Sequence, residues 1–392
     1  MELLDNPIRP YAWGSRTAIA GLQGRPAPTR EPEAELWIGA HPDSPSAVAG
    51  RPLTEVIAAD PAAALGESSV AAFGARLPFL MKVLAAGEPL SLQAHPTNEQ
   101  AEAGFAAEEA AGKPCGAADR NYKDRHHKPE LLVAVEPFDA LCGFADPHLT
   151  ADRLAGLGVA ELGPTIAALR RPDRFAALRD AVAGLMGLGD TARKGLVEEV
   201  VAAARTRSGY ELAVALGERY PGDVGVVVAL LLNHVRLAPG EAVWMPAGNL
   251  HAYLHGTGVE IMAASDNVLR GGLTPKHVDV PELLRVLRFE VLEDPVVRPE
   301  PVAPGLVTWA TPADDFVLHR ASVDGAPITL PGHGPRLVLC LRGEVRVDDG
   351  AGAVTMRGGQ AAFGAAGRTA TVTGVGEVYQ GAPGGLGHVA GS

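Results

Sequence analysis

The segment LSLQAHPTNEQ (residues 90–100) carries two polar side chains, Gln93 and His95, at the end of a short apolar run that stops at Pro96. In a β-strand, residues two apart point to the same face, so these two side chains would lie next to each other. The pattern therefore predicts a strand whose two polar side chains are either ordinary polar residues or one half of a metal site.

Glu130 and His251 are the residues that could complete such a site. Glu130 stands just before the apolar run LLVAV, and His251 lies in AGNLHAYL at the edge of another strand. With Gln93 and His95 they would offer two imidazoles, one carboxylate and one amide oxygen, a set that Zn²⁺ accepts while keeping an open position. A neutral amide oxygen is a weak ligand, so the ion would keep the positive charge of a Lewis acid.

Each of these residues also has an ordinary interpretation. A histidine near a strand end is commonly a hydrogen-bonded polar residue, and His126 and His127 are either alternative ligands or exposed loop histidines. At most one of those two could join, because adjacent strand residues face opposite ways. Lys82, in the apolar stretch FLMKVL, must reach solvent or find an anion, unless it lies on an edge strand. The charged loop VEIMAASDNVLRGGLTPKH (259–277) either serves the function or is simply solvated.

Composition and charge limit the kind of protein. A chain of 392 residues, with 47% hydrophobic and 20% charged residues, is typical of a globular protein of two or three domains. Its formal net charge of −12 argues against a nucleic-acid groove or an anionic membrane surface, since both need basic patches. A small phosphorylated substrate is compatible with this charge, because a few local cations can hold one phosphate.

The cysteines and the N-terminus predict a cytoplasmic protein. Cys115, Cys142 and Cys340 are far apart and form no CxxC motif, which is typical of thiols in a reducing compartment. The start MELLDNPIRPYAWG has acidic residues and prolines where a signal peptide needs a basic start and an apolar run. The longest apolar run, VGVVVALLL, is too short to span a bilayer.

Hydrophobic patterning predicts strands at both ends of the chain and helices between them. Residues 1–146 alternate short apolar segments with turn residues, which indicates short strands. In the stretch from about 148 to 220, RFAALRDAVAGLMGL has apolar residues on one helical face, and KGLVEEVVAAARTR predicts a further helix. Pro172 and Asp173 provide a helix start. The apolar face consists of Phe175, Leu178, Val182, Leu185 and Met186.

Strand patterning returns at residues 235–254 and, after a helical patch at VPELLRVL, from about residue 300 onwards. In RLVLCLRGEVRVDD, the alternation puts Leu337, Leu339 and Leu341 on one face.

Two short stretches resemble each other. GEAVWMPAG (240–248) is similar to GQAAFGAAG (359–367), either by chance or because the chain has two related β-barrel modules. The glycines suit turns on either side of a short buried strand. His251 follows the first stretch by three residues and Ala370 follows the second by three. If the modules are related, any chemistry belongs to the first.

Six blocks of the sequence resemble the type I mannose-6-phosphate isomerase family. The blocks are YAWGS (11–15), ELWIGAHP (35–42), PFLMKVLAAGEPLSLQAHP (78–96), HKPELLVAVEPFDALCGF (127–144), PAGNLHAYL (246–254) and EIMAASDNVLRGGLTPKH (260–277). The resemblance implies a zinc-dependent cupin-type enzyme that interconverts D-mannose 6-phosphate and D-fructose 6-phosphate. With the patterning, it predicts a mainly β fold with two cupin-like β-barrel or jelly-roll modules and a small α-helical domain.

The predicted domains are a catalytic cupin-like domain, a helical insert and a C-terminal cupin-like domain without metal ligands. Their residues are 1–146 with 221–290, then 147–220, and then 291–392.

The resemblance also assigns roles to individual residues. It implies Gln93, His95, Glu130 and His251 as ligands of one zinc ion per chain, Arg270 as the essential arginine, Lys82, Ser91 and Lys276 as phosphate contacts, and Trp13, Lys128, Tyr253 and Glu260 as residues lining the site. Arginine stays protonated, so Arg270 is expected to stabilise an enediolate rather than act as base. Glu260 is the first candidate for the base, and Lys128 the second if its pKa is lowered.

Two other functions are compatible with the same scaffold. One is a different metal-cupin enzyme such as an Fe²⁺ dioxygenase, which would want two or three histidines with a carboxylate, so Gln93 speaks against it. The other is a non-catalytic sugar-phosphate-binding cupin. We expect a monomer whose partner is a small sugar phosphate, with no nucleic-acid or membrane partner.

Overall fold

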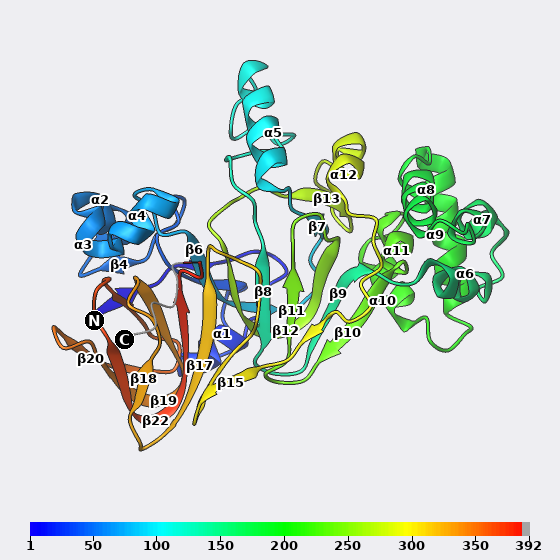
Figure 1. Cartoon of the computed structure of the whole chain (residues 1–392). Coiled ribbons are helices and arrows are strands. Elements are labelled where there is room, and N and C mark those ends of the chain that lie inside the picture. The colour runs from blue at the N-terminus through cyan, green and yellow to red at the C-terminus, as the bar shows by residue number, and fades with distance from the viewer. Residues whose placement is uncertain (386–392) are drawn as a thin grey trace.

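The computed structural model describes residues 1–385, in which two β-sheets carry helices on their flanks and at one end (Figure 1). The chain is therefore mainly β with helices, as its patterning predicted. Among the described residues no helix is both long and apolar enough to cross a bilayer.

The first sheet positions the polar residues of interest. Its order is β14-β11-β8-β12-β6-β3-β2; β7 and β9 join it through β12, β13 pairs with β7, and β10 pairs with β9. The bounds are β2 (Ile8–Arg9), β3 (Glu35–Ile38), β6 (Phe79–Ala86), β7 (Leu92–Ala94), β8 (Glu130–Ala134), β9 (Phe138–Phe144), β10 (Leu232–Leu237), β11 (Ala242–Met245), β12 (His251–Ala263), β13 (Leu269–Gly272) and β14 (Val296–Val297).

Strand β12 holds this sheet together because its two halves have different partners. Residues 256–263 pair with β6 and β8, whereas His251 pairs with β7 and β9. Gly256, with φ of 125°, stands at the change of partner, and a Cβ there would meet Phe138 and Pro137 at 2.8 Å. The glycine therefore permits a close approach that other residues would obstruct.

The second sheet contains the C-terminal strands and the N-terminus. Its order is β15-β16-β17-β22-β19-β21-β1-β4-β5, with β18 on β22 and β20 on β19. The bounds are β1 (Glu2–Asp5), β4 (Ala47–Val48), β5 (Arg51–Pro52), β15 (Glu300–Ala303), β16 (Leu306–Thr308), β17 (Val317–Asp324), β18 (Ile328–Leu330), β19 (Arg336–Asp348), β20 (Ala353–Arg357), β21 (Ala361–Gly364) and β22 (Ala370–Ala382). The predicted face of Leu337, Leu339 and Leu341 is confirmed, since all three pack in one core cluster.

The two similar stretches form the same local structure. β11 and β21 each have four residues and lie between glycines of positive φ, Gly240 and Gly248 around the first and Gly359 and Gly367 around the second. A strand of 13 residues follows each, β12 and β22. The predicted pattern of turn, buried strand and turn is confirmed at both places.

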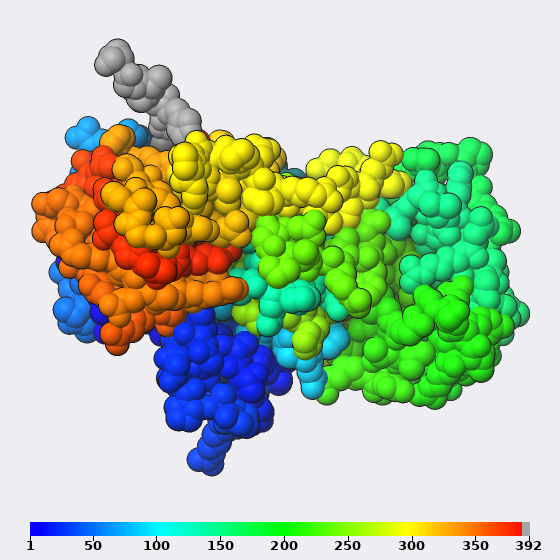
Figure 2. Space-filling view, turned by 90° about the horizontal axis from the view of Figure 1, so that it is seen from below, coloured from blue at the N-terminus to red at the C-terminus, as the bar shows by residue number. Residues whose placement is uncertain are grey.

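The predicted helical stretch contains the helices α6 (Pro147–Ala155), α7 (Gly163–Leu169), α8 (Arg174–Met186), α9 (Asp190–Ala204) and α10 (Glu211–Arg219), with α11 (Gly225–Ala229) following. They form a lobe at one end of the molecule, green in Figure 2. Their core is continuous with Leu92 and Leu269 of the first sheet. The insert is thereby fixed against the strands that carry the site.

Helix α8 begins as predicted, because the Asp173 carboxylate accepts hydrogen bonds from the backbone N–H of Phe175 and Ala176. Four of the five predicted apolar residues are buried. Phe175, which the pattern placed on the same apolar face, is the exception, because it is 54% exposed. It lies in the exposed first turn, and its ring reaches only the edge of Phe289, with 5.8 Å between ring centroids.

The prediction of strands alone for residues 1–146 was wrong in part. This region also contains α1 (Ala18–Leu22), α2 (Leu53–Ala59), α3 (Pro61–Leu65), α4 (Glu67–Phe73) and α5 (Asn98–Ala110). α5 starts directly after Pro96 and Thr97, and Thr97 and Gln100 form a capping box. The predicted helix at VPELLRVL is confirmed as α12 (Val280–Val286).

Candidate metal centre and active site

Three of the four residues that spacing suggested as ligands meet at one point. The Nε2 atoms of His95 and His251 lie 3.3 Å from Glu130 Oε1 and Oε2, respectively. Each side chain is at most 2% exposed. His251 and Glu130 are the first residues of β12 and β8, and His95 directly follows β7, so three strand ends converge on this point.

Backbone carbonyls aim both imidazoles at the carboxylate. His95 Nδ1 lies 2.8 Å from the carbonyl oxygen of Asn267, and His251 Nδ1 lies 3.0 Å from that of Asn249. A carbonyl can only accept, so both Nδ1 atoms carry the proton and both Nε2 atoms present a lone pair.

The atoms that face each other are left without hydrogen bonds. His95 Nε2, His251 Nε2 and Glu130 Oε2 are buried and have no hydrogen-bond partner. Buried polar atoms are normally satisfied, so three orphans that face one another need a further partner. Zn²⁺ fits this set of ligands, which consists of one carboxylate and two imidazole nitrogens whose rings are oriented by backbone carbonyls.

The charges of these residues also suit a cation. Burial lowers the pKa of His95 to about 4, so the imidazole is neutral at pH 7. Burial alone would raise the pKa of Glu130, but Lys128 and His95 hold it well below its usual range. The Lys128 Nζ lies 2.9 Å from Glu130 Oε1. A neutral imidazole and an ionised carboxylate are the forms that bind metal.

Gln93 and the two neighbouring histidines have different positions. Gln93 pairs with His251 and with Arg270 in the strand ladders, and it lines the cavity above the cluster. Its role as fourth ligand stays a prediction. The alternatives His126 and His127 do not join the cluster: His127 Nε2 lies 2.7 Å from Asp315, and His126 lies 3.5 Å from Arg76. Both rings therefore have partners away from the cluster.

A second group that could hold a cation consists of His41, Asp43 and Asp266. Its atoms are not orphaned, because His41 Nε2 lies 3.4 Å from Asp266, and His41 Nδ1 faces the backbone N–H of Asp43 at 3.3 Å. None of the three side chains in this group has a buried polar atom without a hydrogen-bond partner, unlike the side chains of the His95 cluster.

A cavity of about 1240 Å³ opens over the cluster. All the predicted site residues line it except the two imidazoles, which are fully buried. The lining includes Trp13, Lys82, Ser91, Gln93, Lys128, Glu130, Tyr253, Glu260, Arg270 and Lys276. These residues come from strands β6, β7, β8, β12 and β13 of the first sheet and from the segments around Trp13, Ser91, Lys128 and Lys276. The structure thus brings together groups that the sequence separates by more than 250 positions.

On one wall of the cavity, a buried charge network surrounds Glu260. Tyr253 donates a 2.8 Å hydrogen bond to Glu260 Oε1, and Lys82 Nζ lies 3.1 Å from Oε2. Lys82 also lies 3.7 Å from Glu35, whose carboxylate accepts from Trp37 Nε1 at 2.5 Å. Glu35 and Trp37 were not predicted as site residues, although both lie in the block ELWIGAHP.

Burial and the neighbouring charges shift the pKa values of Glu260 and Lys82 in this network. Burial raises the pKa of Glu260, against the opposing effect of Lys82. Burial acts to lower the pKa of Lys82, but the carboxylates of Glu35 and Glu260 raise it overall. Lys82 is therefore a charged lysine held between two carboxylates.

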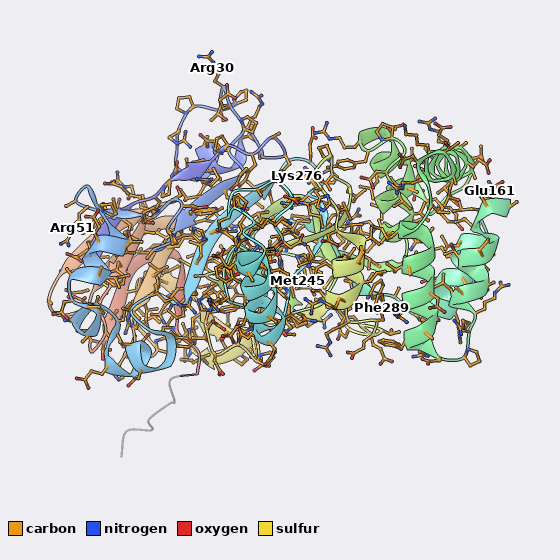
Figure 3. All side chains as sticks on the ribbon, turned by 90° about the horizontal axis from the view of Figure 1, so that it is seen from above. Arg30, Arg51, Glu161, Met245, Lys276 and Phe289 are labelled. Atoms are coloured by element: carbon orange, nitrogen blue, oxygen red, sulfur yellow. The ribbon has the colours of Figure 1, made fainter. Side chains whose placement is uncertain are left out.

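Three cations line another part of the cavity without an acidic partner. Among residues 1–385, no carboxylate lies within ion-pair distance of Lys123, Arg270 or Lys276. Burial lowers the pKa of Lys276, and the charges of Arg270 and Lys123 lower it further, so the three are close enough to repel one another. Figure 3 shows Lys276 between the N-terminal segment and the helical lobe. An anion in this part of the cavity would relieve the repulsion.

Comparisons with known proteins show what the whole chain is similar to. The family model for the catalytic domain of type I phosphomannose isomerase matches residues 1–147. The mannose-6-phosphate isomerase of Shigella flexneri is 38% identical over 371 residues, which cover 93% of this chain and 94% of that protein. The Escherichia coli mannose-6-phosphate isomerase is also 38% identical, over 372 residues, with the same coverage.

Solved structures give the same result. A point mutant of phosphomannose isomerase from Salmonella typhimurium superposes with a TM-score of 0.90 at 35% identity, covering 98% of this chain and 99% of that one. A zinc-bound mannose 6-phosphate isomerase superposes with a TM-score of 0.89 at 35% identity and the same coverage.

Proposed function

The chain belongs to the type I phosphomannose isomerase family, and from this we propose that it interconverts D-mannose 6-phosphate and D-fructose 6-phosphate with one bound zinc ion. The observation that carries the proposal is the group of three orphaned, buried ligand atoms of His95, Glu130 and His251 beneath a charged cavity. Gln93 is the proposed fourth ligand. When bound, zinc supplies a fixed positive charge that stabilises negative charge on a nearby oxygen.

The reaction moves a proton between two neighbouring carbons of the sugar. Removing a proton from carbon leaves an enediol or enediolate, so the site needs a base and a cation. Glu260 is our first candidate for the base. Burial raises the pKa of its carboxylate, which strengthens it as a proton acceptor, whereas the charge of Lys82 opposes this shift and favours the ionised form. Lys128 is the second candidate, and Arg270 supplies the positive charge at the developing oxyanion.

The substrate phosphate is proposed to bind at Lys276 and Ser91. Lys276 lies beside Arg270 and Lys123 and lacks a carboxylate partner among the described residues, so it is free for a charge-assisted contact. A phosphate contact by Lys82 stays a prediction, but its two carboxylate partners favour a role in keeping Glu260 charged. Trp13 and Tyr253 line the sugar side of the cavity.

The two sheets are proposed to be cupin-like modules. The catalytic one comprises 1–146 with 221–290, the helical insert 147–220, and the module without ligands 291–392. The repeated pattern of turn, strand, turn and long strand around β11 and β21 supports this division, and the pairing of β1 with β21 adds an N-terminal strand to the second module. We expect a cytoplasmic monomer that acts on a small sugar phosphate.

The test is an isomerase assay with mannose 6-phosphate before chelation, after chelation and after zinc is restored. Loss with the chelator and recovery with zinc is the expected result. Full activity after thorough metal removal would refute the zinc proposal. Recovery with Fe²⁺ but not with zinc would indicate the other metal-cupin enzyme, and binding of the sugar phosphate without turnover would indicate a non-catalytic protein.

The role of Glu260 has its own test. A Glu260→Gln variant keeps the shape and the hydrogen bond from Tyr253 but cannot accept a proton. We expect exchange of the C2 proton with solvent to fall by about 100-fold or more, the usual size of a general-base contribution. Near-normal exchange in this variant would remove Glu260 from the role and favour Lys128.

A further inference from the structure

Asn267 is a fully buried asparagine in the loop between β12 and β13. The backbone carbonyl oxygen of Asn267 lies 2.8 Å from His95 Nδ1, so this backbone group orients the imidazole. Asn249 provides the corresponding carbonyl for His251. The two asparagines differ in what their side chains do.

The side-chain amide of Asn267 binds a second segment of the chain. Its Oδ1 accepts hydrogen bonds from the backbone N–H groups of Lys123 and Asp124, at 2.7 and 3.2 Å. Its Nδ2 donates to the carbonyls of Asp124 and His126, at 2.9 and 2.8 Å. The amide therefore uses both acceptor positions and both donors on one loop. The Asn249 amide reaches only the sulfur atoms of neighbouring residues.

The segment that Asn267 holds, residues 123–128, carries charged side chains of the site. Lys123 at its start lines the cavity, and its charge acts on Lys276. Lys128 at its end lies 2.9 Å from Glu130. The segment lacks helix and strand structure, so its own backbone hydrogen bonds do not fix it.

Neighbouring residues reinforce the same contact. Ser265 donates from Oγ to Asp124 Oδ1 at 2.9 Å, and the backbone N–H of Asp266 donates to Asp124 Oδ2 at 2.8 Å. The loop at 265–267 and segment 123–128 thus form one hydrogen-bonded unit, with Asn267 linking it to His95.

We propose that Asn267 is a positioning residue that couples the metal centre to the substrate-facing lysines: its carbonyl sets the His95 imidazole, and its side chain sets residues 123–128. Any residue would supply the backbone carbonyl that faces His95, but only asparagine suits the side-chain task, because aspartate lacks the two donors and an aliphatic side chain lacks every polar contact. Its kinetic consequence rests on the proposed function, whereas its consequence for metal binding does not.

The proposal predicts that loss of the side chain disturbs two sites together. Asn267→Ala keeps the backbone carbonyl that faces His95 but loses the side-chain contacts that hold this carbonyl in place. The zinc dissociation constant, measured by chelator competition on the metal-free protein, should therefore rise by about 10- to 100-fold, the usual range when the hydrogen bond to a metal-binding histidine is disturbed. The KM for mannose 6-phosphate, measured at saturating zinc, should rise as well, since Lys123 and Lys128 lose their fixed backbone.

The matched control is Asn233→Ala. Asn233 is an asparagine of intermediate burial whose Nδ2, like that of Asn267, donates to backbone carbonyls, those of residues 142–144 and of Leu292, but it lies outside the cavity lining. This control should lose stability comparably and keep the parental zinc dissociation constant and KM within about twofold.

Asn267→Asp, nearly identical in shape, keeps the proposal testable if the alanine variant does not fold. It retains the acceptor for Lys123 and Asp124 but loses both donors, so both constants should rise in the same direction. Parental zinc affinity and KM in a folded Asn267 variant, or equal changes in the Asn233 control, would overturn the proposal. An inactive parental protein would refute the proposed function alone, because the zinc measurement still reports on Asn267.

Discussion

Replacing Lys82 with methionine should destabilise the protein, and the loss of unfolding free energy measures what Lys82 contributes by compensating two buried carboxylates. Lys82 is 7% exposed and faces Glu260 at 3.1 Å and Glu35 at 3.7 Å. Methionine matches its length but leaves both carboxylates without a cation. Breaking a buried ion pair by removing one partner costs about 3–5 kcal/mol. The attraction of two charges 3.1 Å apart, about 5 kcal/mol at an effective dielectric constant of 20, is of the same size.

The pH dependence of this loss follows from the pKa shifts. The pKa of Lys82 is raised in the folded protein, so its stabilisation is fully present below the pKa of an unfolded lysine, about 10.4, and is lost only at higher pH. The pKa of Glu260 is already raised, and losing Lys82 raises it further. The deficit of the variant should therefore be largest at neutral pH and narrow as the pH falls through the folded pKa of Glu260, towards the unfolded value of about 4.3.

Urea unfolding at pH 7.5 and pH 5, followed by tryptophan fluorescence, measures both effects. Trp37 reports locally, because its ring lies 5.4 Å from Lys82 Nζ. Lys113→Met is the matched control: Lys113 also faces two carboxylates, at 3.1 and 3.2 Å, but is 24% exposed, so it should cost below about 1 kcal/mol. An unfolding free energy of Lys82→Met within about 1 kcal/mol of the parent at pH 7.5 would refute the reasoning.

Three further predictions follow from the site and the helical insert. Glu130→Gln removes the only carboxylate among the three orphaned ligand atoms, so zinc affinity, measured by chelator competition, should fall by about 100-fold or more. Lys276→Met should raise KM for mannose 6-phosphate by about 10-fold or more with a smaller change in kcat, and an unchanged KM would exclude its phosphate contact. Leu178→Ala, in the core of α8, should lower the unfolding free energy by about 2–5 kcal/mol, whereas Phe175→Ala, at a residue 54% exposed, should cost below about 1 kcal/mol.

Local patterns predicted local structure well. The spacing of Gln93 and His95 indicated a strand, and β7 is one, although His95 lies one residue beyond its end. Asp173 marked the start of α8 because a short carboxylate side chain caps backbone N–H groups of the first turn. Thr97 and Gln100 are a signal of the same kind at the start of α5, a helix that was not predicted.

Contacts between distant residues could not be predicted in this way. The contact of His127 Nε2 with the Asp315 carboxylate joins positions 188 residues apart, and nothing near either residue in the sequence indicates the other. The carboxylate of Glu35 gains its importance from Lys82, on the neighbouring strand β6. The exposure of Phe175 depends on where the core of the helical lobe ends, and helical periodicity carries no information about that limit. Pairing partners and core limits are properties of the whole fold.

None of the proposed ligands comes from the C-terminal part of the chain, yet Asp315, Arg342 and Trp309 from that part hold both ends of the segment that presents Glu130. Before β8, His127 is bound by Asp315 at 2.7 Å. After β8, Arg342 donates to the carbonyl of Val135 at 3.1 Å, and Trp309 Nε1 donates to that of Gly240 at 3.0 Å.

Gly240 in turn donates its N–H to Ala134, the last residue of β8, at 2.8 Å. A carboxylate that must meet two imidazoles within a few tenths of an ångström needs a strand that cannot slide along its neighbours. The second sheet and the residues beside it supply that restraint from outside the site, so the C-terminal part of the chain takes part in positioning Glu130.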